Sequence, residues 1–251
     1  MQTTTLAQLQ ALIDEAYCLF KDYEMGEGIA VCSGHGCCLH PHDADLLRGT
    51  PVQQLELRLI YEFLNASEAE DIPLLVQQMK HLILRILELM IQGEYLGTGF
   101  ALSKCKCGSG LWLEQEIDFL QRFASAYFAS KCTDDDIETD AVLEDTVLMF
   151  HLAGLDVWPL LKQWQAVIDQ AGPFNNFIFM LMCNFETGSF ESAYEEEDLN
   201  RKMTDWISED GFKSSIQQVL AEKLAQSDLS KRHQWEYGRA LVHLSLAAKN
   251  E

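Results

Sequence analysis

The sequence is poor in basic residues, and this scarcity limits what the protein can bind. Its 251 residues include 18 Lys and Arg against 39 Asp and Glu, which gives a formal net charge of −21 at pH 7. No Lys/Arg cluster forms the basic surface with which proteins bind phosphate backbones. We therefore exclude nucleic acid as a ligand and disfavour anionic membrane surfaces. The acidic charge is compatible with a basic partner protein. The alternative is that the charge only keeps the protein soluble.

A long hydrophobic run is also missing. The most apolar stretch, residues 174–185, is too short to span a bilayer and is interrupted by Asn175 and Asn176. The first residues, Met1–Thr5, lack the basic and apolar regions of a signal peptide. We therefore expect a cytoplasmic protein. In that compartment its eight cysteines are expected to be thiols, metal ligands or redox-active groups rather than a disulfide framework.

Familiar catalytic sequence patterns are absent. The chain contains no G-x-G-x-x-G or G-x4-G-K-[ST] phosphate loop, no H-E-x-x-H zinc motif and no G-x-S-x-G nucleophile turn. It also lacks the Glu-x-x-His pairs of di-iron helical bundles, because Gln78 and Leu148 stand three residues before His81 and His151. The sequence thus leaves enzyme activity undecided and leans against it.

Helical periodicity dominates what is present, and strand signals are missing. Short connections favour antiparallel neighbours, so we predict an all-α fold, an irregular bundle of about 9–11 helices. We treat residues 1–251 as one helical domain, with a possible subdomain boundary in the acidic link near residues 133–138. The expected helices cover residues 5–24, 41–48, 50–66, 72–92, 111–131, 139–153, 156–171, 174–187, 189–208, 211–226 and 229–248.

Packing roles are expected for most aromatic and isolated cysteine side chains. The helix around residues 174–185 is apolar on most sides, so it should be a core element. Aromatic side chains at helical spacing are usually core, and isolated cysteines in helices usually pack as small hydrophobes. This expectation covers Trp158, Trp164, Trp206, Trp235, Cys18, Cys132 and Cys183.

A Cys/His cluster at residues 32–42 is the most chemically suggestive feature. Thiolates and imidazoles at close spacing are ligands that zinc or iron prefers. A second, smaller group lies in another glycine-containing loop, and the two loops together could supply four ligands. The candidate metal ligands are Cys32, His35, Cys37, Cys38, His40, His42, Cys105 and Cys107.

Three explanations of this cluster stay open: buried packing residues, a zinc or iron site, and a reactive thiol at the vicinal Cys37–Cys38 pair. Three functions follow. The first is a helical interaction protein, with or without a structural metal. The second is an acidic immunity or inhibitor protein that covers a basic toxin or enzyme, docking through Asp134–Asp136 and Glu195–Asp198. The third is a metal- or thiol-dependent enzyme that uses the loop at residues 32–42.

Overall fold

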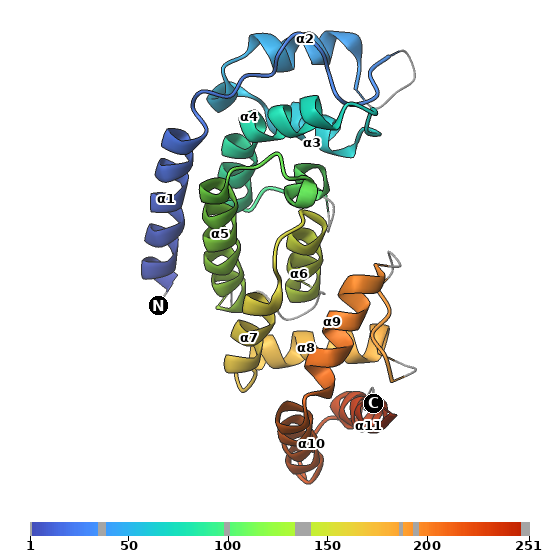
Figure 1. The fold of residues 1–251 in the computed structure, drawn as a ribbon. Coiled ribbons are helices and arrows are strands. Elements are labelled where there is room, and N and C mark those ends of the chain that lie inside the picture. The colour runs from blue at the N-terminus through green and yellow to red at the C-terminus, as the bar shows by residue number, and fades with distance from the viewer. Residues whose placement is uncertain are drawn as a thin grey trace. The chain divides into compact units, whose positions relative to one another are not determined.

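The fold is helical throughout the part of the chain that the computed structural model describes. The structure describes residues 2–34, 39–97, 101–133, 142–185, 188–192 and 196–246. These ranges contain eleven α-helices and three short 3₁₀ helices (Figure 1). Their only β-structure is two isolated bridges, Val31 with Glu68 and Ser33 with Leu39. The predicted all-α class is confirmed.

The chain divides into two compact units, which are described separately. The first comprises Met1–Ser130 and Asp145–Val157, and the second comprises Lys131–Glu144 and Trp158–Glu251. Most of the predicted boundary, residues 134–138, lies outside the described residues.

Helix α4 is the centre of the first unit. Asp71 begins it, because its side chain accepts a hydrogen bond from the Leu74 N–H at 3.0 Å. Its buried face, from Leu75 to Met90, contacts α1, α3, η1 and η2. The helices of this unit are α1 (Gln2–Leu19), α2 (Pro41–Gly49), η1 (Val52–Gln54), α3 (Leu57–Asn65), α4 (Ile72–Ile91), η2 (Ser103–Cys105) and η3 (Cys107–Ser109), with α5 (Glu114–Cys132) and α6 (Val142–Leu152) crossing the division between units.

The single helix expected over residues 50–66 is wrong, because it is split into η1 and α3. Leu55 and Glu56 between them are extended, with ψ angles of 126° and 148°. The Leu55 carbonyl accepts a hydrogen bond from Arg85 Nε on α4 at 3.0 Å. This long-range bond directs the carbonyl away from a helical path, an effect that local sequence patterns do not contain.

The second unit is built on α8 and α11. Helix α11 packs against α8 and α10, and α10 also contacts α9. An aromatic cluster of Trp164, Phe177, Trp206 and Phe212 fills its interior, with ring centroids 5.0 to 6.1 Å apart. The helices are α7 (Trp158–Ala166), α8 (Ala171–Asn184), α9 (Glu197–Ser208), α10 (Asp210–Leu224) and α11 (Lys231–Leu246).

Several side chains expected in the core are at the surface instead. Trp164 and Trp206 are fully buried, whereas Trp235 is 57% exposed. Helix α8 is buried on most sides as predicted, but its Phe179 is 43% exposed. Cys18 and Cys183 are exposed too, although Cys132 is buried. None of the described helices is both long enough and apolar enough to cross a membrane.

Candidate functional site

The predicted metal ligands of the first loop are only partly described. Cys32 is exposed and disulfide-bonded, and the other five described cysteines form no disulfide. The sequence predicts thiols, metal ligands or redox-active groups rather than a disulfide framework, and the disulfide of Cys32 departs from the first of these alternatives. His35, Cys37 and Cys38 lie outside the described residues.

The two histidines that follow belong to the beginning of α2. His40 is its N-cap residue, and its Nδ1 accepts a hydrogen bond from the His42 N–H at 3.2 Å. Both side chains are exposed. Pro41 occupies the first helical position, where a missing N–H costs nothing. These contacts give His40 a capping role, and they leave its ligand role a prediction.

The two cysteine-containing loops adjoin the same short segment of the chain. The Cys32 N–H donates to the Ser67 carbonyl at 2.7 Å. Lys106, between Cys105 and Cys107, forms an ion pair with Glu68 at 3.0 Å. The approach of the first loop is fixed by the buried Gln78 side chain, which bonds the backbone of three residues at 2.8 to 2.9 Å; these are Met25, Gly28 and Ala30.

Cys105 and Cys107 are buried in a tightly held turn. Lys106 between them has a left-handed backbone with φ of 50°. Trp112 Nε1 donates to the Cys105 carbonyl at 2.6 Å, and the Cys107 N–H donates to the Ala153 carbonyl at 2.9 Å. Gly154, which follows Ala153, has φ of 88°. A Cβ added at this position would lie 3.0 Å from the Gly108 nitrogen, so a side chain does not fit here.

The chemistry of this pair disfavours a thiolate. A hydrogen bond with Cys107 and burial both raise the pKa of Cys105 well above its ordinary value. Among the described residues, no group of three or more His, Cys, Asp or Glu side chains is arranged to hold a metal. The zinc or iron site therefore stays a prediction.

The acidic docking charge proposed from the sequence is partly neutralised. Asp198 forms ion pairs with Arg201 and, at 2.7 Å, with Lys202. The hydrogen bond from Lys202 is the main reason that the pKa of Asp198 is lowered. Residues 134–136 and 195 lie outside the described residues.

A first cavity, in the first unit, is lined by one member of a buried ion pair. Lys80 is one of its lining residues, and the side chains of Lys80 and Glu116 are 6% and 1% exposed. Lys80 Nζ lies 2.7 Å from Glu116 Oε2, 2.9 Å from the Leu111 carbonyl and 3.1 Å from the Tyr23 hydroxyl. These three acceptors match the three protons of an ammonium group, so the network is a structural link between α4 and α5.

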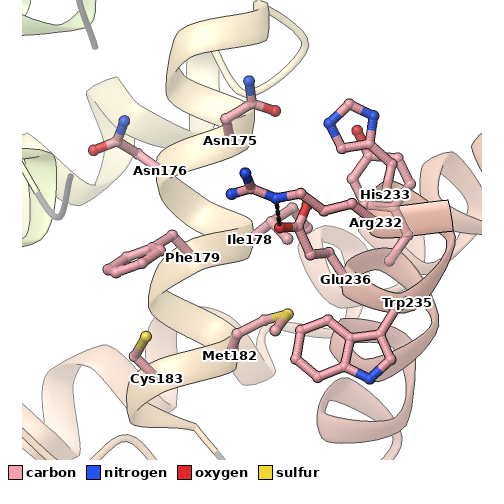
Figure 2. A pocket seen from close by; sticks show the side chains of 11 residues that line it. Asn175, Asn176, Ile178, Phe179, Met182, Cys183, Arg232, His233, Trp235 and Glu236 are labelled. Carbon is pink, nitrogen blue, oxygen red and sulfur yellow. Dashed lines mark hydrogen bonds and ion pairs between the residues drawn. The ribbon is translucent and has the colours of Figure 1, made fainter. Parts of the chain in front are cut away.

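A second cavity, between α8 and α11, is the better candidate for a binding site. Its volume is about 280 Å³, near the lower end of ligand pockets. Figure 2 shows Ile178 and Met182 on the side of α8 toward α11 and Phe179 and Cys183 on its other flank, while Arg232 extends from α11 toward α8. The lining residues are Asn175, Asn176, Ile178, Phe179, Met182, Cys183, Arg232, His233, Trp235, Glu236 and Tyr237.

Interactions within α11 hold the side chains of this pocket in place. Arg232 Nε donates to Glu236 at 2.7 Å, the dashed line in Figure 2. The His233 ring stacks on Tyr237 with centroids 5.6 Å apart and planes 8° apart. The Arg239 guanidinium lies 5.5 Å from the Trp235 ring centroid, a cation–π contact that orients an exposed ring. The rim is therefore pre-organised.

The charge at the start of α11 is unusual for this chain. Residues 211–246 carry five Lys and Arg against three Asp and Glu, the reverse of the overall excess. The first turn of α11 holds Lys231, Arg232 and His233 and no acidic residue. The positive end of a helix dipole disfavours cations, so this placement costs stability. Departures from local sequence preferences are common at functional or strained sites, so this turn is a candidate binding position.

Sequence patterns did not reveal this pocket. The aromatic spacing predicts a core position for Trp235, and Phe179 belongs to a helix predicted to be apolar on most sides. The available signal was the basic first turn of α11, which breaks the usual charge preference of a helix N-terminus.

Comparisons with protein-family models, with curated proteins and with solved structures find no match to this chain. The structure alone defines the class: an all-α protein of two units, with a pre-organised pocket in the second unit.

Proposed function

We propose that this chain is a non-enzymatic interaction protein whose pocket between α8 and α11 binds an apolar group of another molecule. The observation that carries the proposal is the exposure of Phe179 and Trp235 at this cavity. Large exposed aromatic side chains that line a cavity are typical of binding sites.

The polar groups of the pocket support binding more than acid–base chemistry. Arg232 and Glu236 are paired with each other, and His233 is stacked on Tyr237. Groups engaged in this way define a rim and orient a ligand. An apolar floor with a few fixed polar groups is the usual composition of a ligand pocket.

A neutral fluorescent probe tests the proposal. N-phenyl-1-naphthylamine emits strongly only in apolar surroundings, and its two linked aromatic systems suit an apolar pocket. We expect saturable binding to the wild-type chain at a single site. The double variant Phe179→Ser with Trp235→Ser should lose most of this binding, because both exposed rings are removed.

Tyr95→Ser is the matched control. Tyr95 is 64% exposed, comparable to Trp235, but it lies in the first unit and does not line the pocket. This variant should bind the dye as the wild type does. Absence of saturable binding to the wild type would contradict the proposal, and so would equal binding to the double variant with its helical content intact.

A further inference from the structure

An apolar stripe continues along α11 beyond the pocket. Trp235, Val242 and Leu246 are 57%, 58% and 54% exposed. Their spacing of seven and four residues puts them on one face of the helix. At 1.5 Å per residue the stripe is about 16 Å long, or three helical turns. A surface of this length fits a helical segment better than a single small molecule.

The charge beside the stripe indicates the chemistry of the occupant. Lys231, Arg232 and His233 stand at the start of α11, where the helix dipole adds further positive potential. Arg239 lies between Trp235 and Val242 along the same helix. Carboxylates are the groups that such a basic edge recognises, and guanidinium groups bind them in a defined geometry.

We infer that the α8–α11 surface binds an amphipathic helical segment of another protein, one whose apolar face is bordered by Asp or Glu. An apolar side chain of that segment enters the pocket, and its acidic border meets Lys231, Arg232 and Arg239. This inference rests on the proposed function and adds the chemistry of the partner. The overall charge of −21 opposes an acidic partner at long range, but salt limits that repulsion to about 8 Å at physiological ionic strength.

Two synthetic helical peptides test the inference by displacing N-phenyl-1-naphthylamine from the wild-type chain. Both carry Leu and Phe at helical positions i, i+4 and i+7. One has Glu along the border of this apolar face, and the other has Lys at the same positions. We expect the Glu peptide to displace the dye at a concentration about tenfold lower than the Lys peptide requires.

The variant Lys231→Gln should reduce this preference several-fold while its affinity for the neutral dye stays unchanged, because Lys231 is not among the residues that line the pocket. High salt should also reduce the preference, because the added attraction is between surface charges. Lys213→Gln is the control: it removes one positive charge from α10, lies outside the pocket lining, and should keep the preference.

The outcomes separate the two proposals. If the dye does not bind, the proposed function itself fails. If the dye binds but both peptides displace it equally, only the acidic partner is refuted. Better displacement by the Lys peptide would also overturn the inference, in favour of the basic partner expected from the net charge. A dimer of the wild type that dissociates on Trp235→Ser would overturn it as well, with a second copy as occupant.

Discussion

Replacing Lys231 by Glu should stabilise the protein while it weakens the binding of an acidic partner. Lys231 is the first residue of α11. The hydroxyl of Ser230, the residue before the helix, accepts a hydrogen bond from the His233 N–H at 3.1 Å. A cation at this end of a helix is unfavourable and an anion favourable, each by about 0.3–1 kcal/mol. The substitution removes one effect and adds the other, so the expected gain is about 0.6–2 kcal/mol.

Lys223→Glu is the matched control because it changes the net charge equally but lies at the opposite end of a helix. Lys223 is in the last turn of α10, where a cation is favourable. Its Nζ also lies 4.9 Å from the Phe174 ring centroid. This variant should lose about 0.6–2 kcal/mol through the dipole and roughly 0.5–1 kcal/mol through the cation–π contact.

Thermal unfolding followed by far-UV circular dichroism measures the difference. One kcal/mol corresponds to roughly 2–4 °C in a chain of this size, so the two melting temperatures should differ by at least about 4 °C. The difference between the two melting temperatures should become smaller at high salt. If Lys231→Glu destabilises the chain, or if both variants shift the same way, the first-turn cations support the fold, and their assignment to a ligand is refuted.

Three further predictions concern the interior and the cysteines. Glu116→Gln should cost about 3–5 kcal/mol in chemical denaturation because it leaves Lys80 buried without a counter-charge. Lys80→Met combined with Glu116→Leu should cost much less, and equal costs would contradict a buried ion pair. Burial raises the pKa of the Cys132 thiol to about 12 in the folded chain. The unfolded chain therefore loses the thiol proton at a lower pH than the folded chain does. The free energy of unfolding should be unaffected by this thiol below about pH 9 and should fall by about 1.4 kcal/mol per pH unit above pH 9. Cys132→Ala should flatten that alkaline fall, and an unchanged slope would refute the assignment. Elemental analysis of chain purified without a histidine tag tests the predicted zinc or iron site: bound metal lost in Cys105→Ser with Cys107→Ser would support it, and metal below about a tenth of an equivalent would refute it.

Helix positions were largely predictable because amphipathic periodicity and capping are local. The helix expected over residues 72–92 is observed as Ile72–Ile91, and Asp71 provides the cap that precedes it. The helix expected over residues 229–248 is observed as Lys231–Leu246. Errors arose where a distant group intervened, as when Arg85 bound the Leu55 carbonyl and divided a predicted helix.

Burial was less predictable because it depends on which helices meet. Four tryptophans looked alike in sequence, yet Trp206 lies inside an aromatic cluster and Trp235 lies at the surface. Periodicity identifies an apolar face but not whether another element covers it. The pocket therefore could not be found from the apolar pattern of residues 174–185 alone.

The chemistry of the cysteines depended on tertiary structure too. The spacing of Cys105 and Cys107 left open whether they pack or bind a metal, whereas the turn buries both thiols and bonds the Cys107 N–H to the Ala153 carbonyl. Sequence spacing also gave no reason to expect that Ser67 and Glu68 would adjoin both loops. Such contacts join residues more than thirty positions apart, so they lie beyond any local motif.

Alkylation of Cys183 is the most direct test of the binding pocket. Cys183 lines the pocket and is exposed, while Cys18 is an exposed thiol on α1 and serves as the internal control. Iodoacetamide labelling of both sites can be followed by peptide mass spectrometry with and without saturating N-phenyl-1-naphthylamine. Bound dye should slow the labelling of Cys183 several-fold and leave the labelling rate of Cys18 unchanged. Equal labelling rates at Cys183 with and without bound dye would contradict binding in this pocket.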